Sequence, residues 1–430
     1  LFTHKTRDIS FTLVVDDFGI KYVNEDDVTH LRNTIEKHYP VKFKMDPEQY
    51  IGITLKFDYE KREVICSMDG YIEDALREFE HMFPTQHHYG PAKHVDIKYG
   101  AKVQYAVTDN EPNLTPEQIK YIQQVTGKLL FYARAIDNTM LHTLNMIATT
   151  TITGTTATLD AANYLLNYAA CNPNAEIRYS ASDMILNVHS DAAYLVAPEA
   201  RSRAGGFHFL GTKNRSQFNG PLLVLARTIK NVMTSAAESE ISALFMNARE
   251  AIPIRRALIN LGHQQPPTPI ISDNSTAVGI IKGTMKQKQS KSFNKEHNWL
   301  RDRMLRGYFD YHWEKGSTNL GDYPTKKHPP QHHRRVRPIQ LYIKDESPTT
   351  MEQCSTILQS AHSPKSFDMT KQGCVRKRTG TPQPLITQAA YTCTRTFPTN
   401  LSHSNISRRR SNNKLYKHIK QSNILPSYLL

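Results

Sequence analysis

An alternation of strand-like and helix-like segments between residues 184 and 328 constrains the fold of this chain more than any other feature. The expected elements are strands near 184–190, 205–211 and 219–227, a helix near 236–261, a strand at 268–272, a helix from about 274, a helix at 289–305, a strand at 307–314 and a short helix from 319. Strands that follow one another directly, and then strands separated by helices, predict an α/β domain with a mixed sheet.

Four carboxylates lie where these elements begin or end. Asp191 follows the first strand, Glu240 lies in the first turns of the long helix, Asp273 ends a later strand and Asp322 opens the last short helix. If one edge of the sheet gathers them, they suit a two-metal phosphodiester hydrolase, in which one ion activates water and the other stabilises the leaving oxygen. Acids are also common at these positions as helix caps and dipole partners, so the spacing alone leaves both interpretations open.

A second acidic motif lies near the start of the chain. Residues 9–17 form a β-branched apolar run that ends in Asp16 and Asp17, and an apolar stretch follows at 18–23. This pattern predicts a β-hairpin with acids at its turn. Two adjacent acids can hold Mg²⁺, although a solvated Asp-Asp turn is the plain alternative.

The chain between these regions is expected to be mixed at first and then helical. A helix is predicted at 26–38 and two paired strands at 50–57 and 63–68. Three helices are predicted at about 116–134, 138–149 and 157–169, with Thr115 and Thr156 as the N-caps of the first and third.

The length of the chain and the distribution of its charge limit the number of folded domains that it can contain. A chain of 430 residues can build two ordinary cores. The formal net charge is +14, but residues 331–430 hold 16 Lys+Arg against 4 Asp+Glu, which leaves 38 against 36 in residues 1–330. The charge therefore says little about the folded part. Residues from about 345 to 430 are rich in Ser, Thr, Asn, Gln, Pro, Lys and Arg, which predicts disorder.

Several classes of protein are disfavoured by the composition. The five cysteines are widely spaced and include no CxxC pair, which favours a reducing compartment over a disulfide framework or a zinc site. No apolar run approaches the roughly 18 residues of a membrane span, and no signal peptide is visible, so a membrane or secreted protein is not expected. The chain begins at Leu1, which suggests excision from a longer protein.

Short motifs in a fixed order point to a family. They are Leu13-Val-Val-Asp-Asp-Phe18, Tyr50-Ile-Gly-Ile53, Leu129-Leu-Phe-Tyr-Ala-Arg134, His189-Ser-Asp-Ala192, Arg201-Ser-Arg-Ala-Gly-Gly206, Ser235-Ala-Ala-Glu-Ser-Glu-Ile241, Ile271-Ser-Asp-Asn-Ser275, Ser290-Lys-Ser292, Trp299-Leu-Arg-Asp302 and Asn319-Leu-Gly-Asp-Tyr-Pro-Thr-Lys326. With these motifs, residues 10 to about 340 resemble the reverse-transcriptase and RNase H portion of copia-type retrotransposon polyproteins.

The resemblance implies a fold class and four parts. The expected fold is α/β and α+β: a truncated reverse-transcriptase palm at 1–100, a helical connection at 101–182, an RNase H-like mixed-sheet domain at 183–328 and a basic, largely disordered tail at 329–430. The parent activity would be RNA-directed DNA synthesis coupled to hydrolysis of the RNA strand in RNA–DNA hybrids. Each active site would use two Mg²⁺ ions, with Mn²⁺ as an alternative.

The resemblance also assigns roles to the acids. Asp16 and Asp17 would be two of three polymerase metal ligands; the third belongs to an upstream strand that this chain lacks, so we do not expect it to polymerise DNA. Asp191, Glu240, Asp273 and Asp322 would be the catalytic and metal-binding acids of RNase H, with Glu238 as the fallback for Glu240.

The resemblance also implies binding partners for the chain, and two alternative functions remain open. An RNA–DNA hybrid, a template/primer and the rest of the polyprotein are the implied partners, in a cytoplasmic virus-like particle or the nucleus. Two pairs of arginines could contact phosphates: Arg201 and Arg203 in a loop between the first two strands of the α/β domain, and Arg334 and Arg335 in a basic cluster. An inactive product of a decayed element, or a nucleic-acid-binding module without catalysis, remains the alternative.

Overall fold

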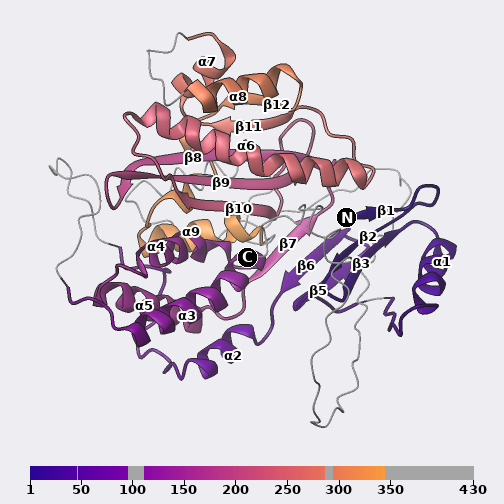
Figure 1. Cartoon of the computed structure of the whole chain (residues 1–430), viewed down its shortest axis with the longest axis horizontal. Coiled ribbons are helices and arrows are strands. Elements are labelled where there is room, and N and C mark those ends of the chain that lie inside the picture. The colour runs from indigo at the N-terminus through magenta and orange to yellow at the C-terminus, as the bar shows by residue number, and fades with distance from the viewer. Residues whose placement is uncertain (46, 95–110, 286–293, 344–430) are drawn as a thin grey trace, which may run out of the picture. The chain divides into compact units, whose positions relative to one another are not determined.

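The computed structural model describes residues 1–45, 47–94, 111–285 and 294–343 (Figure 1). The tail expected to be disordered, from about 345, lies outside them. Contacts divide the chain into a small unit, Leu1–Pro47, and a large unit that begins at Glu48. Among the described residues, no helix combines the length and apolar character needed to cross a bilayer.

The small unit is an antiparallel sheet with one helix. Strands β1 (Phe2–Thr3), β2 (Ile9–Val14) and β3 (Asp17–Tyr22) pair in that order, and α1 (Glu25–Glu36) follows. Ile9, Ile20, Tyr22 and Val28 form its core. The predicted hairpin is present: Val14 pairs with Asp17, so Val15 and Asp16 form the two-residue turn.

The large unit begins with a four-stranded antiparallel sheet and a helical layer. The strands are β4 (Gln49–Tyr50), β5 (Ile53–Asp58), β6 (Glu63–Ser67) and β7 (Glu176–Ser180), in that order. The helices are α2 (Tyr71–Glu78), α3 (Pro116–Ala135), α4 (Leu141–Thr150, after the 3-10 turn η1 at Asn138–Met140) and α5 (Thr156–Cys171). β7 was not predicted from the sequence. It pairs with β6 from Glu63↔Ser180 to Ser67↔Glu176 and so joins residues far apart in the chain.

Two helix starts test the predicted caps. Thr115 caps α3 as predicted: its hydroxyl accepts a hydrogen bond from the Gln118 backbone N–H at 3.3 Å, and the Gln118 side chain accepts one from the Thr115 N–H at 2.8 Å. For α5 the prediction was wrong by one residue, because Thr155 is the N-cap and its side chain makes no capping hydrogen bond. The capping box explains why the start of α3 could be read from the sequence.

The second sheet of the large unit is mixed. Strands β8 (Ile185–Ala197), β9 (Arg201–Gly211), β10 (Pro221–Thr228), β11 (Thr268–Ser272) and β12 (Phe309–Trp313) lie in the order β10-β9-β8-β11-β12. β8, β9 and β10 are antiparallel, whereas β11 is parallel to both β8 and β12. This arrangement confirms the predicted fold class, a mixed α/β chain with a mixed sheet.

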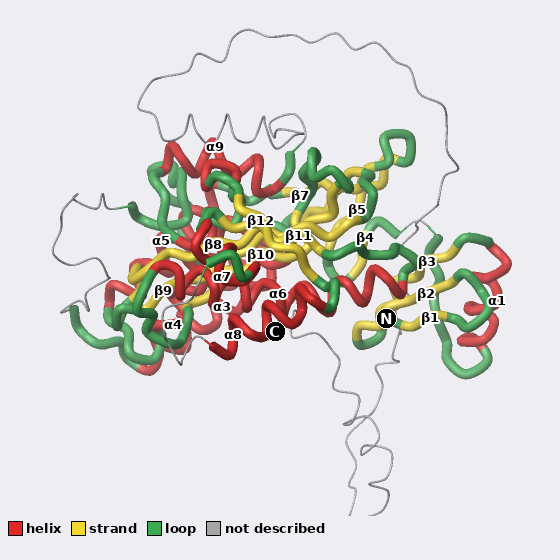
Figure 2. The backbone as a smooth tube through the Cα atoms, turned by 90° about the horizontal axis from the view of Figure 1, so that it is seen from above, coloured by secondary structure: helices red, strands yellow, loops and turns green. Residues whose placement is uncertain are grey.

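Helices cover both faces of this sheet. α6 (Ala236–Asn260) lies along one face and α9 (Pro330–Leu341) along the other, as Figure 2 shows. α7 (Ser275–Lys282) and α8 (Asn294–Leu305) extend the α6 side, where Ile241, Leu244 and Ala248 pack against β8 and β11. On the opposite side, Val336 and Ile339 of α9 pack against Phe207 and Phe209 of β9.

Helix α9 lies in the segment where the sequence analysis expected a tail. Arg337 makes an ion pair of 2.9 Å with the fully buried Asp137, and Asn138 donates a hydrogen bond of 2.9 Å to the Gln340 carbonyl. The buried side chains His332, Val336 and Ile339 recur at helical spacing. Two prolines and several cations in the same twelve residues obscure that pattern in the sequence.

Candidate metal centre

Three of the predicted acids meet at one edge of the mixed sheet. Asp191 lies within β8, Glu240 in the second turn of α6 and Asp273 directly after β11. One carboxylate oxygen of each lies within 4.8 Å of the other two. Among the described residues, no second group of three or more His, Cys, Asp or Glu side chains meets that distance. Asp191 and Glu240 are buried and Asp273 is half-buried.

Strand pairing and hydrogen bonds bring these acids together. Ile271 of β11 pairs with His189 of β8 in a parallel register, so Asp273 and Asp191 each lie two residues beyond paired positions. The Glu240 carboxylate accepts hydrogen bonds from the Ala192 backbone N–H at 3.1 Å and from the Ser272 hydroxyl at 3.3 Å. Both donors lie beside the other two acids, and the three elements are therefore connected at the cluster itself.

Asp322 stands beside the cluster and is held by a lysine. It precedes the 3-10 turn η3 (Tyr323–Thr325), and its carboxylate contacts the Lys326 ammonium at 2.6 Å. The Thr325 hydroxyl lies 3.1 Å from an Asp191 carboxylate oxygen, at hydrogen-bond distance. Of the four predicted acids, the structure thus brings three within ligand distance of one another and places the fourth in a lysine ion pair.

Two hydrogen bonds hold the loop that carries Asp322 against β8. The Asn319 side chain donates a hydrogen bond of 2.8 Å to the Ser190 carbonyl. The Leu320 backbone N–H donates one of 3.1 Å to His189 Nδ1. His189 is fully buried, and burial lowers its pKa to about 3, with Arg215 acting in the same direction. His189 is therefore a neutral structural residue that fixes this loop.

Burial and mutual repulsion raise the pKa of the clustered acids. For Asp191, burial is the largest cause and the negative charges of Asp322 and Asp273 add to it, which raises the pKa to about 8. Burial followed by Asp191 raises the pKa of Glu240, and burial followed by Asp322 raises that of Asp273. Burial lowers the pKa of Lys326, but its acidic neighbours outweigh that effect and the net shift is upward.

The donor set fits a hard divalent cation. The three clustered side chains offer carboxylate oxygens, which Mg²⁺ and Mn²⁺ prefer over nitrogen or sulfur. Their raised pKa values mean that the crowded carboxylates hold protons more tightly than isolated ones do. A cation among them would supply the missing positive charge and favour the ionised form.

The alternative glutamate has another role. Glu238 accepts hydrogen bonds from the Thr234 backbone N–H at 2.8 Å and from the Thr234 hydroxyl at 2.6 Å. Its own N–H is bonded to the side chain of the N-cap residue Ser235 at 3.2 Å. Glu238 therefore stabilises the N-terminus of α6, while Glu240 is the glutamate in the cluster.

The acids of the hairpin lie in the small unit. Asp16 is exposed and Asp17 is half-buried, at the turn between β2 and β3. Burial, and then the charge of Asp16, raises the pKa of Asp17. Within the described residues, no third metal-ligating side chain joins this pair.

The four arginines proposed to contact phosphates differ in their surroundings. The expectation that Arg201 and Arg203 lie in a loop is wrong, because β9 begins at Arg201. Arg203 is buried and donates a hydrogen bond of 2.8 Å to Asn145, whereas Arg201 pairs with Glu199 at 2.6 Å. Arg334 is exposed, with its guanidinium over the Tyr89 ring at 4.8 Å, and Arg335 is half-buried.

Sequence reasoning did not assign the residues that support the cluster. Ser272 and Thr325 contact Glu240 and Asp191 of the cluster, and Lys326 contacts the neighbouring Asp322. None of the three was proposed as a site residue. A signal was present, since Ser272 directly precedes Asp273 and the other two end the Asn319–Lys326 motif.

The chain is similar to one known retrotransposon polyprotein over two thirds of its length. No family model matches the chain. The chain is similar to the retrovirus-related Pol polyprotein from transposon TNT 1-94 of Nicotiana tabacum, with 21% identity over 294 residues, or 68% of this chain. It spans 21% of that relative's length. The resemblance to a retrotransposon polyprotein is thus confirmed.

Two solved structures are similar over about a third of the chain. One is the N-terminal RNase H domain of a Mycobacterium tuberculosis protein, solved as a fusion with maltose-binding protein: 12% identity, 32% of this chain, 92% of that chain and a TM-score of 0.25. The other is an RNase H1 isolated from compost by a metagenomic approach: 14% identity, 33% of this chain, 93% of that chain and a TM-score of 0.26.

Proposed function

We propose that this chain hydrolyses the RNA strand of RNA–DNA hybrids at the cluster of Asp191, Glu240 and Asp273, with two divalent metal ions, Mg²⁺ or Mn²⁺. The observation that carries the proposal is the convergence of these three carboxylates within 4.8 Å of one another, from two strands and a helix. The similarity to a retrotransposon polyprotein supports the choice of substrate.

The chain's own residues would hold and orient the metal ligands. Asp191, Glu240 and Asp273 would bind the ions, and Asp322 would join them from the adjacent loop. Bound ions supply an activated water and stabilise the leaving oxygen, so no protein nucleophile is needed. The Ala192 N–H and the Ser272 hydroxyl fix the rotamer of Glu240, and Lys326 holds Asp322 beside Asp191.

The rest of the assignment follows from the resemblance and belongs to the same proposal. Residues 1–100 would be the palm remnant, 101–182 the connection, 183–328 the RNase H-like domain and 329–430 a region that includes α9 and the basic tail. Asp16 and Asp17 would supply two carboxylates to a polymerase site that needs a further acid. The partners would be a hybrid or template/primer and the remaining polyprotein, in a virus-like particle or the nucleus.

The test is cleavage of a labelled RNA–DNA hybrid by the full chain, with Mg²⁺ and with EDTA. We expect metal-dependent cutting of the RNA strand in the hybrid but not of RNA alone. Glu240→Gln should abolish it. Glu238→Gln is the matched control, because this buried glutamate lies on the same helix and faces Thr234 instead.

Three outcomes would contradict the proposal. If the folded wild-type chain binds the hybrid without cutting it in Mg²⁺ or Mn²⁺, a binding module without catalysis is the better description. If the folded chain neither binds nor cuts, an inactive product of a decayed element is favoured. Loss of activity in Glu238→Gln with full activity in Glu240→Gln would move the metal site to the other glutamate.

A further inference from the structure

The apolar face of β12 continues beyond the part that helices cover. Phe309, Tyr311 and Trp313 alternate along this strand, so their side chains point to the same face of the sheet. Phe309 and Tyr311 are buried in the core that α7 and α8 form with the sheet. Trp313, at the last position of the strand, is 52% exposed. A large apolar ring is therefore open to solvent at the end of an otherwise buried strand face.

The two tryptophans of the chain have different surroundings. The Trp299 ring lies edge-on to the Phe245 ring, with 5.1 Å between centroids, and the Arg303 guanidinium lies 5.3 Å from the Trp299 ring centre. Within the described residues, no aromatic ring or cation packs in this way against Trp313. Trp299 is thus a packed residue of the α8 layer, whereas the Trp313 ring has a free surface.

Trp313 is held beside the acid cluster. Its indole N–H donates a hydrogen bond of 2.8 Å to the backbone carbonyl of Asp273. Trp313 also pairs with Ser272 in the parallel register of β11 and β12. A Cβ atom at Gly316 would lie 2.5 Å from an Asp273 carboxylate oxygen, so the chain after Trp313 passes directly beside that carboxylate. The indole is therefore fixed in place next to a residue of the cluster.

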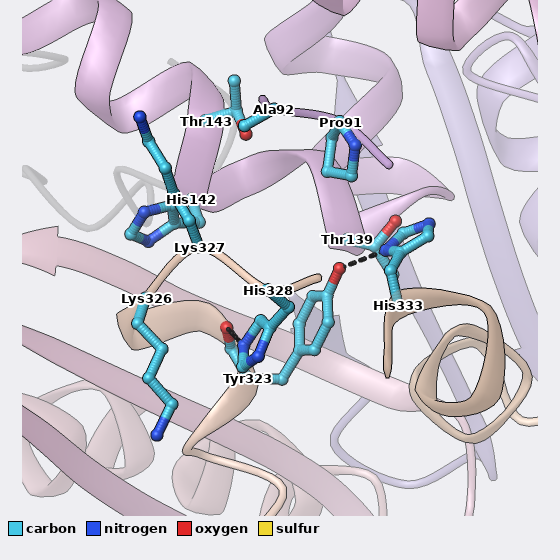
Figure 3. A pocket seen from close by; sticks show the side chains of 10 residues that line it. All are labelled: Pro91, Ala92, Thr139, His142, Thr143, Tyr323, Lys326, Lys327, His328 and His333. Carbon is cyan, nitrogen blue, oxygen red and sulfur yellow. Dashed lines mark hydrogen bonds between the residues drawn. The ribbon is translucent and has the colours of Figure 1, made fainter. Parts of the chain in front are cut away.

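The acids lie between two kinds of side chain along the sheet. Asp191 is on β8 and Asp273 follows β11, with β9 on one side of these two strands and β12 on the other. The η3 loop contacts β9, and its Lys326 points away from Lys327 in Figure 3 and pairs with the acid of the same loop. Trp313 is on the β12 side. The cluster is thus bordered by a cation on one side and by an aromatic ring on the other.

The charges around Trp313 are compatible with a polyanion. Glu314, the next residue, forms an ion pair of 3.1 Å with Arg215. Lys315 is exposed, and in the described part of the chain it forms no ion pair. Proteins that bind nucleic-acid strands combine such cations, which contact phosphates, with aromatic rings, which pack on nucleotides. A nucleic acid therefore suits this surface better than an acidic or a purely apolar partner.

We propose that Trp313 packs against a nucleotide of the substrate, next to the phosphate that reaches the acid cluster. The ligand is the flat or apolar face of one nucleotide, which is either a sugar in the groove of the paired hybrid or the base of an unpaired nucleotide. The choice of a nucleic acid rests on the proposed function, because Trp313 is hydrogen-bonded to Asp273. Trp313 would position the strand without taking part in the chemistry.

The first experiment measures tryptophan fluorescence of the full chain in EDTA as an RNA–DNA hybrid is added. Trp299→Phe leaves Trp313 as the only tryptophan, and saturating hybrid should change its emission. Trp313→Phe leaves Trp299, whose emission should change little. Fluorescence anisotropy of a labelled hybrid measures binding independently. If the hybrid binds while the Trp313 emission stays constant, the ring does not contact nucleic acid, and a protein partner fits it better.

The second experiment measures hybrid affinity in EDTA at several salt concentrations. Trp313→Ala should weaken binding about 5- to 100-fold, the range lost when alanine replaces an aromatic ring that stacks on a nucleotide. The slope of log K against log salt should stay the same, because no phosphate contact is lost. Trp313→Tyr should keep most of the affinity. Tyr308→Ala, at a partly exposed aromatic residue at the opposite end of β12, is the matched control and should change neither quantity.

Two results of that experiment would overturn the proposal. An equal loss of affinity in Tyr308→Ala and Trp313→Ala would indicate a general effect on β12. A smaller salt slope in Trp313→Ala would indicate that a phosphate contact, rather than packing on a nucleotide, had been removed.

Hybrids with one abasic nucleotide, placed at successive positions, separate the base from the sugar. If Trp313 packs on a base, Trp313→Ala should have no effect on affinity when that base is the missing one. If it packs on a sugar, the substitution should weaken binding for every position of the abasic nucleotide.

These measurements do not depend on catalysis. A chain that binds hybrid through Trp313 but never cleaves it would refute the proposed hydrolysis and leave the nucleotide contact standing. A chain that cleaves hybrid while Trp313→Ala changes neither affinity nor KM would do the reverse. A folded chain that does not bind hybrid at all would contradict both proposals.

Discussion

The two acidic sites of this chain differ in how their carboxylates come together. Asp16 and Asp17 are adjacent in sequence at an open two-residue turn, where Val15 is 93% exposed. Asp191, Glu240 and Asp273 are distant in sequence, come from three elements and are oriented by neighbouring donors. Burial raises the pKa in both places, but only in the cluster do several buried carboxylates repel one another. Adjacency in sequence gives proximity, whereas a metal centre also needs burial and orientation.

The largest expected effect is a difference in cleavage rate between substitutions at the two acidic sites. Asp191→Asn should lower metal-dependent cleavage of the hybrid by more than about 100-fold, because even residues that merely orient metal ligands cost about 10- to 100-fold. Asp17→Asn should leave the rate unchanged. Single-turnover cleavage by the full chain measures both. A comparable loss in Asp17→Asn would show that the hairpin contributes to the same reaction.

The second prediction concerns α9 and its buried ion pair with Asp137. Arg337→Met should destabilise the large unit by about 3 kcal/mol, because it leaves the fully buried Asp137 carboxylate without its cation. Burial acts to raise the pKa of Asp137, and Arg337 is the main reason that the net shift is downward. Urea unfolding measures the change. Arg334→Met, at an exposed position of α9, is the control, and equal effects would contradict the buried pair.

The third prediction uses the pKa of Asp191. Its folded-state pKa of about 8 is above the usual value, so its contribution to stability is present at low pH and is lost as pH rises toward 8. Between pH 6 and 8 without metal, the wild type should lose on the order of 2 kcal/mol relative to Asp191→Asn.

The difference between the two proteins is the informative quantity in that experiment. Buried histidines with lowered pKa values, such as His142 and His208, stabilise the folded chain as pH rises and act in the opposite direction. They are common to both proteins and cancel. Saturating Mg²⁺ should reduce the pH dependence of the wild type alone, and an identical response in Asp191→Asn would contradict a metal at this residue.

The smallest expected effect lies in the hairpin. Val15 adopts a positive φ of 56°, which is unfavourable for a β-branched residue and suits glycine at the first position of such a turn. Val15→Gly should stabilise the small unit by about 0.5 kcal/mol, since relief of strain exceeds the added entropy of the unfolded chain. Thermal unfolding of the full chain, followed by a probe in this unit, checks the direction. Destabilisation would mean that the valine side chain packs.

Most regular elements of the mixed sheet could be predicted because their signals are local. The strands at 184–190 and 268–272 and the helix from 236 follow apolar periodicity, and Thr115 with Gln118 marks a helix start. The four acids could be singled out because they stand at or near the ends that the sequence predicts for such elements, although β8 continues past Asp191 to Ala197. The resemblance to a retrotransposon polyprotein also rested on short local motifs, such as Asn319-Leu-Gly-Asp-Tyr-Pro-Thr-Lys326.

The tertiary structure decided what periodicity does not encode. β7 exists because it pairs with β6 across more than a hundred residues, and α9 because Val336 and Ile339 find a sheet face and Arg337 finds Asp137. Likewise, Asp191 and Asp273 become neighbours only through the parallel register of β8 and β11. Asp322 forms an ion pair with Lys326 instead of lying within ligand distance of the other three acids. Local sequence specifies which residues carry charge and which turn inward; long-range pairing and burial determine which charges meet and what that proximity does to their pKa values.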